Sequence, residues 1–570
     1  MTQIEGIGAS PGIAIGKALV IEREERVTRG RLLADPTEIA REIEQYRFAV
    51  RRSIAEIRGI LDTARPDTDS ADILEVQIEL LGDPQMERDV VQKISTGMKT
   101  AYDATLETVG EITELFHGLE DNYIRERSAD IQDMGNRLLR NLEGAAEPAL
   151  SAEAGTILVA WDLAPSHTLT LDTSRVNGLL TGAGGRTSHA AIIARSRGLA
   201  AVVGFGEAIQ GITPGDTIIL DGETGTVIID PEPAVLDTYT TRQQAQQAKA
   251  ALLHALRGKP SVTQDGWAVP LLANVASMAD LNLVQAYGGE GVGLLRTELL
   301  FMDRDTMPTE EEQFSFYKSI ARHTKGKPLT IRTLDLGGDK PLPYLPLPAE
   351  ENPALGYRAI RVCLREPDIF LPQLKAILRA SAWGKVKVLF PMISTVAEVR
   401  EARALLDEAK RQLTREGVGF NKEIPVGVMI EVPAAAYIAD LLAREVDFFS
   451  IGTNDLVQYM LAADRMNPRV AGLYDPFHPA VIRLLQFVVQ QAQRQLVRVS
   501  LCGEMASDPL ATLLLIGLGV DELSANPASI PLVKNTVVSH TRSAAQALAK
   551  RVLTMDNAAQ IRACLEEAIS

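Results

Sequence analysis

About eight short apolar runs alternate with amphipathic helical stretches between residue 262 and the C-terminus, and this alternation restricts the fold more than any other feature of the chain. The runs are Leu271–Val275, Val292–Arg296, Thr330–Thr333, Val386–Pro391, Val426–Glu431, Phe448–Thr453, Val499–Cys502 and Glu522–Ala525. A strand followed by a helix, repeated about eight times in a region of this size, predicts a (β/α)₈ barrel. Such barrels carry their active sites at the C-terminal ends of the strands, so reactive side chains are expected there.

Polar side chains do stand at or just beyond the ends of these runs. They are Arg296, Arg332, Glu431, the pair Asn454 and Asp455, and Cys502, with Arg358 and Arg465 as further candidates. Any one of them alone is more often part of a surface ion pair or an inert buried thiol. Agreement at five strand ends makes that explanation a poor one for the whole set.

The residue types in this set point to one kind of chemistry. Glu431 and Asp455 are hard oxygen ligands on neighbouring strands, which suits Mg²⁺ completed by water and substrate. Arg296 and Arg332 carry planar guanidinium groups that match phosphate or carboxylate oxygens. Cys502 is either a small buried hydrophobe or, facing a metal and arginines, a proton donor. The set predicts a small, strongly anionic substrate on a metal ion, with phosphoryl transfer as the leading reaction class.

A second candidate site precedes this region. Residues 184–190 read Gly-Gly-Arg-Thr-Ser-His-Ala, which predicts a turn after a strand, a cap at Thr187 or Ser188, and a helix that starts at His189. A helix N-terminus favours an anion, and Arg186 adds a positive charge. A lone His is usually incidental, but an imidazole in this setting is nucleophilic near neutral pH. His189 is therefore a candidate acceptor of phosphate.

The sequence before the barrel divides into regions with different patterns of apolar and polar residues. Residues 35–144 show apolar residues at helical spacing after the helix-start signal Asp35-Pro36, which predicts an α-helical bundle. Residues 1–34 and 145–230 hold short strands and one helix, which predicts a small α/β domain interrupted by the bundle. Residues 231–261 are rich in Gln and Ala and predict a helical linker to the barrel at 262–570.

Composition excludes several classes of protein. The formal net charge of −16 argues against nucleic acid as a partner. No apolar run approaches the ~20 residues that span a bilayer, and the N-terminus does not look like a secretion signal. Three scattered cysteines fit neither a disulfide framework nor a zinc site. We expect a protein of the cytoplasm that does not insert into a membrane.

Over essentially its whole length the chain resembles Enzyme I of the bacterial sugar phosphotransferase system, the phosphoenolpyruvate–protein phosphotransferase family. The resemblance rests on long motifs in each predicted domain: residues 10–14 (Ser-Pro-Gly-Ile-Ala), 184–189, 293–298 (Gly-Leu-Leu-Arg-Thr-Glu), 332–340, 351–353, 447–456 and 502–504 (Cys-Gly-Glu). Together these motifs are very specific.

The resemblance implies a role for each candidate. His189 would be the phosphorylated histidine, in a phosphohistidine domain formed by residues 1–34 and 145–230. Arg296, Arg332, Arg465, Asn454 and Asp455 would hold phosphoenolpyruvate, Glu431 and Asp455 would hold Mg²⁺, and Cys502 would protonate the enolate to give pyruvate. The helical domain would dock the histidine phosphocarrier protein HPr or an HPr-like carrier, and the barrel would form a homodimer.

Two alternatives are disfavoured by the sequence. Pyruvate phosphate dikinase and phosphoenolpyruvate synthase share the two domains but need an ATP-binding domain, and no Gly-rich nucleotide loop occurs here. A non-catalytic scaffold on the same fold would not need the candidate residues, all of which are intact. One departure from the family concerns the carrier: Gln77 stands where a His is expected in the docking helix, so the identity of the carrier is open.

Overall fold

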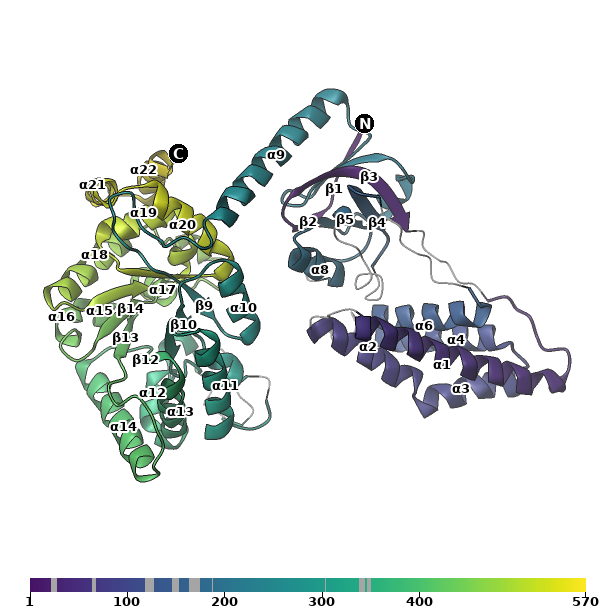
Figure 1. Cartoon of the computed structure of the whole chain (residues 1–570), viewed down its shortest axis with the longest axis horizontal. Helices are drawn as coiled ribbons and strands as arrows, with labels where there is room; N and C mark the ends of the chain where they lie inside the picture. Colours follow the sequence, from purple (N-terminus) through teal and green to yellow (C-terminus); the bar gives the residue numbers. More distant parts are fainter. Residues whose placement is uncertain are drawn as a thin grey trace. The chain divides into compact units, whose positions relative to one another are not determined.

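The computed structural model describes the chain except for residues 22–27, 64–67, 118–127, 146–152, 164–174, 187, 303, 338–343, 346–349 and 570. It divides into two compact units, Met1–Ala248 and Lys249–Ser570. The first holds a helical bundle and an α/β sheet, and the second holds a strand barrel surrounded by helices (Figure 1).

The predicted (β/α)₈ barrel is confirmed. Its strands are β9 (Leu271–Val275), β10 (Val292–Leu295), β11 (Pro328–Arg332), β12 (Lys385–Phe390), β13 (Val426–Ile430), β14 (Phe448–Ile451), β15 (Arg498–Leu501) and β16 (Glu522–Ala525). Each strand pairs in parallel with the next, and β16 pairs with β9 to close the ring. Their side chains are largely buried, because parallel strands of a barrel face a packed interior and a shell of helices.

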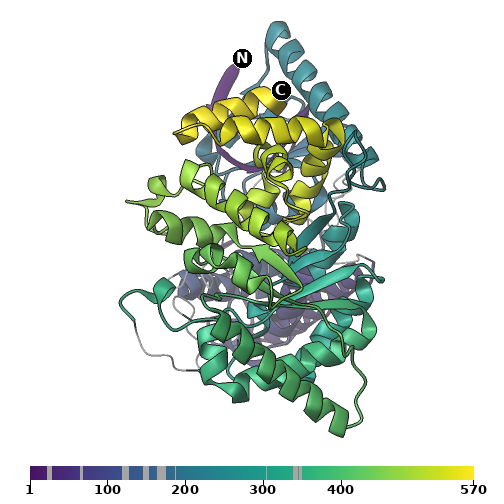
Figure 2. The same ribbon diagram turned by 90° about the vertical axis from the view of Figure 1, so that its left-hand side faces the viewer.

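Helices cover the outside of the barrel (Figure 2). They are α10 (Met278–Ala286), α11 (Glu310–His323), α12 (Ile360–Arg365), α13 (Pro367–Ala380), α14 (Val396–Arg415), α15 (Pro433–Tyr437), α16 (Ala439–Leu442), α17 (Thr453–Leu461), α18 (Pro479–Arg494), α19 (Pro509–Leu518), α20 (Ile530–Ser539), α21 (Arg542–Val552) and α22 (Ala558–Ile569). Their apolar faces and the strands share one core. A smaller cluster fills the barrel interior and includes Met429, Phe448 and Cys502.

The α/β domain contains one sheet in the order β1-β8-β7-β3-β4-β5-β6-β2. Its elements are β1 (Thr2–Glu5), β2 (Ile7–Ser10), β3 (Ile13–Ile21), β4 (Thr156–Ala160), β5 (Val176–Thr181), α8 (His189–Arg197), β6 (Ala200–Val203), β7 (Thr217–Asp221) and β8 (Thr226–Ile229). Strands β3 to β6 run parallel, and the flanking pairs are antiparallel. The edge strands β1 and β2 were not expected, because each has four residues and little apolar alternation.

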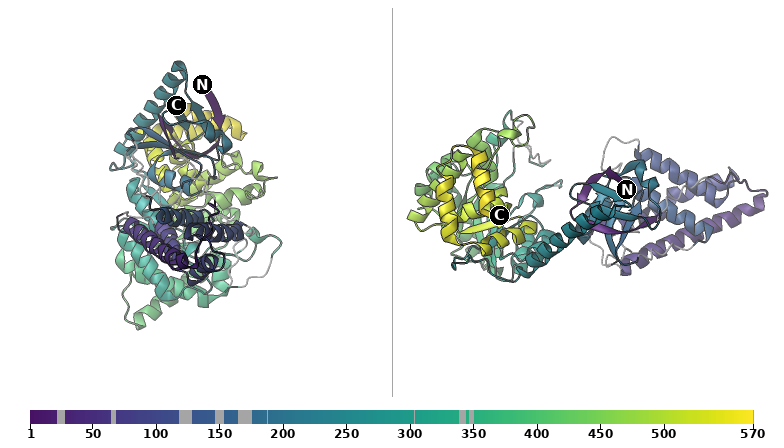
Figure 3. Two further views of the ribbon diagram at one scale, coloured as in Figure 1. Left: turned by 90° about the vertical axis from the view of Figure 1, so that its right-hand side faces the viewer. Right: turned by 90° about the horizontal axis from the view of Figure 1, so that it is seen from above.

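The bundle lies in the chain between β3 and β4. Its helices are α1 (Ile39–Thr63), α2 (Thr68–Leu81), α3 (Pro84–Ser95), α4 (Ala101–His117) and α6 (Ser128–Glu143). They lie side by side around an apolar core (Figure 3). The Asp35-Pro36 signal starts a short 3₁₀ turn before α1, in which the Asp35 side chain accepts a hydrogen bond from Thr37 N at 2.8 Å. The last described helix of the bundle, α6, begins directly after residues 118–127, which lie outside the described part of the chain.

Helix α9 (Pro233–Ala255) occupies the Gln-rich stretch. Arg242 Nη2 lies 3.1 Å from Asp221 Oδ2, and Gln243 donates to Ile13 O at 2.9 Å, so the N-terminal half of α9 is attached to the α/β domain. Among the helices of the described residues, none combines the length and apolar character needed to cross a bilayer.

Candidate active site

The predicted site residues of the barrel follow its strands at the C-terminal end. Arg332 is the last residue of β11, and Arg296, Glu431 and Cys502 each come directly after a strand. Asn454 and Asp455 also lie just beyond the end of a strand. They lie in the first turn of α17, three and four residues beyond the end of β14, rather than at the strand end itself.

A series of ion pairs links Arg332 to Asp455 and includes Glu298, Asp335 and Arg358. Arg332 pairs with Glu298 on one side, and its Nη1 lies 2.9 Å from Asp335 Oδ2 on the other. The second oxygen of Asp335 lies 2.9 Å from Arg358 Nη2, which also approaches Asp455 Oδ2 at 3.4 Å. Asp335 therefore holds two guanidinium groups on one carboxylate.

Arg465, the last side chain in this series of ion pairs, is exposed to solvent. Arg465 Nη2 lies 3.7 Å from Asp455 Oδ1, and 35% of the Arg465 side chain is exposed, against 11% for Arg332. Arg296 is exposed, and within the described residues no ion pair holds its side chain. The two arginines held by Asp335, of which Arg332 is buried and Arg358 partly buried, and the two exposed ones can together surround a small anion with several negative groups.

Sequence reasoning assigned no role to Glu298 and Asp335, although both lie in the motifs that carry the family resemblance. Both side chains are 5% exposed. A carboxylate three residues after a strand-end arginine is a weak signal that could have indicated Asp335. Nothing in the sequence indicates that Glu298 and Arg332 are paired, because they follow different strands.

Glu431 is buried among other acids. Its Oε1 accepts a hydrogen bond from Met392 N at 2.6 Å. Burial, together with the negative charges of Asp455 and Asp335, raises the pKa of Glu431 to about 8. A Cβ at Gly452 would lie 2.9 Å from the other oxygen, Oε2, so the glycine keeps the space beside that oxygen clear.

These features fit a bound divalent cation. Burial, and after it the repulsion from Asp455 and Asp335, raises the pKa of Glu431, and a bound cation would offset both effects. Mg²⁺ is commonly held by one or two carboxylates plus substrate oxygens. Within the described part of the chain, no three or more His, Cys, Asp or Glu side chains are grouped to hold a metal by themselves. Glu431 and Asp455 would be the protein ligands, and water and substrate would supply the rest.

Cys502 is a buried thiol with 3% of its surface exposed. The Ser450 hydroxyl donates to its Sγ at 3.2 Å. Burial raises the pKa of Cys502 to about 11, although Ser450 and the charges of Arg332 and Arg296 act in the opposite direction. The thiol therefore keeps its proton at neutral pH, as a proton donor must.

Asn454 fixes the loop that follows Cys502. Its Oδ1 accepts from Glu504 N at 2.8 Å, and its Nδ2 donates to Glu504 Oε1 at 3.2 Å. The paired amide and backbone groups join the start of α17 to the Cys-Gly-Glu segment. Asn454 is partly exposed, which leaves one face of its amide for a ligand.

The second candidate site has the predicted strand–turn–helix form. Gly184 has φ +98°, Ser188 N donates to Gly185 O at 3.0 Å, and α8 begins at His189. Ser188 occupies the N-cap position, but its side chain makes no cap hydrogen bond, and Thr187 lies outside the described residues. The side chain of His189 is also outside the described part of the structure. The free N–H groups at the start of α8 favour a bound anion.

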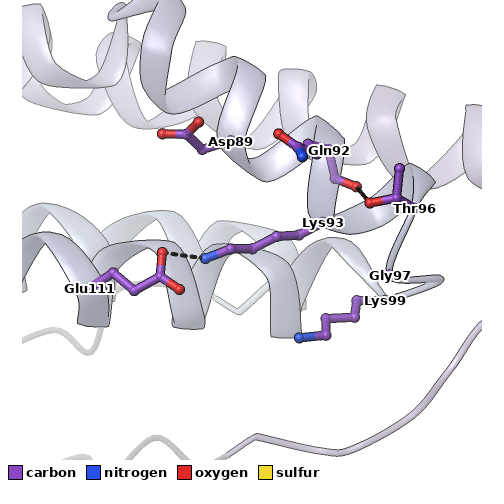
Figure 4. Close-up of a pocket in the computed structure, with 7 residues that line it drawn as sticks. All are labelled: Asp89, Gln92, Lys93, Thr96, Gly97, Lys99 and Glu111. Atoms are coloured by element: carbon purple, nitrogen blue, oxygen red, sulfur yellow. Dashed lines mark hydrogen bonds and ion pairs between the residues drawn. The ribbon is translucent and has the colours of Figure 1, made fainter.

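A pocket of about 400 Å³ lies in the helical bundle (Figure 4). It is lined by Asp89, Gln92, Lys93, Thr96, Gly97, Lys99 and Glu111. Lys93 Nζ lies 2.6 Å from Glu111 Oε2, and Lys99 Nζ lies 2.5 Å from Glu107 Oε2. Because both lysines are paired with acids, the pocket has no excess positive charge for a phosphate, and it contains none of the predicted site residues.

Gln77 does not lie on the surface of the bundle. Its side chain is 0% exposed, and its Nε2 donates to Asp133 Oδ2 at 3.2 Å, between α2 and α6. The residue that departs from the family pattern is therefore part of the bundle interior.

Three family models match the chain and define its class. The "PEP-utilising enzyme, PEP-binding domain" matches residues 250–542, the "PEP-utilising enzyme, N-terminal" matches 5–127, and the "PEP-utilising enzyme, mobile domain" matches 152–225. The chain is therefore an enzyme of the phosphoenolpyruvate-utilising class. Its three matched parts are the barrel with its strand-end arginines and acids, the inserted bundle, and the domain that carries the histidine turn.

Full-length relatives narrow the class to one family. The phosphoenolpyruvate-protein phosphotransferase of Bacillus subtilis (strain 168) is 43% identical over 100% of both chains, and that of Priestia megaterium is 42% identical over 98% of both. A solved N-terminal Enzyme I structure is 33% identical, covers 43% of this chain and 99% of its own, and has a TM-score of 0.37. The chain belongs to the phosphoenolpyruvate-protein phosphotransferase family, Enzyme I.

Proposed function

We propose that this enzyme transfers the phosphoryl group of phosphoenolpyruvate to its own His189 and then to HPr or an HPr-like carrier, releasing pyruvate and starting the sugar phosphotransferase cascade. One observation carries the proposal. Asp335 gathers Arg332 and Arg358 beside the acids Glu431 and Asp455, in the region that the PEP-binding family model matches.

The charges of the site match those of phosphoenolpyruvate, which carries a phosphate and a carboxylate. Arg332 and Arg358 are held by Asp335 and would meet the anion without reorganising, whereas Arg296 and Arg465 are exposed and would close on it. Asn454 would donate from its amide. Mg²⁺, held by Glu431 and Asp455, would neutralise charge on the substrate oxygens.

The first half-reaction transfers phosphate within the protein. The bond between phosphorus and the enol oxygen breaks, a bond between phosphorus and a His189 ring nitrogen forms, and the electron pair of the broken bond stays on the oxygen of pyruvate enolate. The N–H groups at the start of α8 and Arg186 would stabilise the phosphate on His189. In the second half-reaction the phosphoryl group passes to a histidine of the carrier.

The enolate then needs a proton on carbon. Cys502 supports this role because its thiol is protonated at neutral pH and lies near Arg332 and Arg296, whose charges stabilise the thiolate left behind. A C–H bond forms on the methylene carbon as the S–H bond breaks, and solvent returns a proton to sulfur.

Replacement of Cys502 by alanine should separate these steps. We expect Cys502→Ala to slow net pyruvate formation far more than it slows phosphoryl exchange between His189 and bound enolate, because phosphoryl transfer uses the arginines and the metal but not the thiol. Phosphoenolpyruvate with a stereospecifically labelled methylene should give chiral pyruvate with the unmodified enzyme and racemic pyruvate with the variant. Chiral pyruvate formed by the variant at the full rate would leave Cys502 as a packed core thiol. Cys363→Ala is the matched control, since Cys363 is buried outside the barrel interior.

The carrier would dock on the helical bundle. Because Gln77 is buried against Asp133, we infer that the His-to-Gln difference acts through bundle packing and not through direct contact with the carrier. From family membership we also propose that the barrel forms a homodimer and that the enzyme works in the cytoplasm.

The whole proposal is tested by supplying the purified chain with labelled phosphoenolpyruvate, Mg²⁺ and a panel of purified histidine carriers. We expect label on the chain, release of pyruvate, and label on at least one HPr-like carrier. If no carrier accepts label although the chain is labelled, the carrier assignment fails. If the chain itself takes up no label, the proposed reaction fails.

A further inference from the structure

The carbonyl group of Cys502 is held by a side chain from a strand that is not its neighbour. Asn274 is the penultimate residue of β9, and its Nδ2 donates to Cys502 O at 2.9 Å. Cys502 follows β15, whereas β9 pairs with β16 and β10. The Asn274 side chain therefore reaches past β16, inside the barrel, to the end of β15.

The neighbouring strands fix the orientation of this amide. Ser524, on β16, donates its hydroxyl to Asn274 Oδ1 at 2.7 Å. A carbonyl oxygen can only accept, so the amide nitrogen must face Cys502 and the amide oxygen must face Ser524. A Cβ at Gly293 on β10 would lie 2.4 Å from Ser524 Oγ, so the glycine provides the space for this hydroxyl.

The hydrogen bond from Asn274 restrains the peptide that follows the thiol. Cys502 N donates to Ile451 O at 3.0 Å, which fixes the peptide before the thiol. The peptide after it leads to Gly503, where a Cβ would lie 1.8 Å from Thr453 Oγ1, so this position has no side chain to limit its backbone. Asn274 supplies a direct hydrogen bond to the Cys502 carbonyl itself.

We propose that Asn274 is a positioning residue for the proton donor: it fixes the Cys502 carbonyl so that the thiol faces the methylene carbon of the enolate. The inference rests on the proposed function and deepens its last step. Asn274 exchanges no proton. The C–H bond forms as the S–H bond of Cys502 breaks, the electron pair stays on sulfur, and solvent reprotonates the thiolate. Phosphoryl transfer to His189 does not depend on Asn274.

The test compares Asn274→Asp with Asn421→Asp in the full-length chain. The first substitution keeps the shape of the side chain but places an oxygen against the Cys502 carbonyl. The second changes an exposed loop asparagine whose Oδ1 accepts from Glu423 N at 3.0 Å. With stereospecifically labelled phosphoenolpyruvate and Mg²⁺, we expect Asn274→Asp to slow enolate protonation about tenfold, the effect of one lost hydrogen bond. Its pyruvate should lose most of its chirality, while ³²P labelling of His189 stays within about twofold. Asn421→Asp should match the unmodified enzyme in every readout.

A second variant, Ser524→Ala, leaves Asn274 in place and removes only the group that orients its amide. We expect the same pattern with a smaller loss of rate, about threefold, and this variant decides the matter if Asn274→Asp does not fold. Full chirality at full rate in the folded variants would overturn the inference. Equal losses of labelling and protonation would also overturn it, because Asn274 would then serve the whole site. If the unmodified enzyme neither labels His189 nor releases pyruvate, the proposed function fails and the inference with it.

Discussion

Replacing His189 by alanine is expected to abolish incorporation of ³²P from labelled phosphoenolpyruvate. The imidazole is the proposed acceptor, and alanine offers no nucleophilic atom at the start of α8. Binding of phosphoenolpyruvate with Mg²⁺ should persist, because the arginines and acids that carry it belong to Lys249–Ser570 and not to the unit that contains His189. Labelling is measured on the denatured protein in alkali, where phosphohistidine survives, and binding is measured by calorimetry.

His254→Ala is the matched control. His254 lies in the last turn of α9 and is exposed, so its loss should leave labelling at the level of the unmodified enzyme. Appreciable labelling of His189→Ala would mean that another residue accepts the phosphate. Loss of substrate binding in that variant would mean that the barrel needs the histidine to hold phosphoenolpyruvate, against the division of roles proposed here.

The barrel was the most predictable part of the fold. A parallel strand buried on both faces must be a short continuous apolar run, and each run from Leu271–Val275 to Glu522–Ala525 corresponds to one strand. The edge strands β1 and β2 escaped prediction for the opposite reason. Each pairs on one side only, so Thr2–Glu5 and Ile7–Ser10 need no apolar pattern to form.

The positions of candidate site residues were predictable where these residues are next to a strand end in the sequence. Arg332 and Glu431 could be found in this way because the fold itself fixes where strand ends meet. Glu298 and Asn274 could not, because their partners belong to other strands: Glu298 meets Arg332, and Asn274 meets Cys502. Register and barrel closure bring these pairs together, and a single sequence records neither.

The sequence also left the role of Cys502 open between a core thiol and a proton donor. The structure adds its burial inside the barrel, the hydroxyl of Ser450 on its sulfur, and a pKa of about 11. A thiol that packs with core residues such as Met429 can be both a core residue and a proton donor. The thiol is packed like a core residue and is also protonated and held in place, which is what donation to one face of an enolate requires.

Substitution of Glu431 by glutamine is expected to lower the rate of phosphoryl transfer by about a thousandfold or more, since a divalent ion on a highly anionic substrate is worth several kcal/mol. Glutamine keeps the size of the side chain and removes its charge. Asp455→Asn should have an effect of the same order, because both carboxylates are proposed to hold one ion. Binding of Mg²⁺ in the presence of phosphoenolpyruvate is measured by calorimetry in a His189→Ala background, which prevents turnover. Glu423→Gln, an exposed position shortly before β13, is the control and should bind Mg²⁺ normally.

The pH dependence of this binding distinguishes a metal ligand from a structural acid. Burial and the charges of Asp455 and Asp335 raise the pKa of Glu431 to about 8 before a cation binds. Below that pH, Mg²⁺ must displace a proton, so its affinity should increase as pH rises toward 8 and level off above it. In Glu431→Gln there is no proton to displace at this position, and the affinity should be weak and nearly independent of pH across the same range. If Glu431→Gln bound Mg²⁺ as tightly as the unmodified chain, with the same pH profile, the cation would have other ligands, and the raised pKa of Glu431 would reflect only its burial and the charges of Asp455 and Asp335.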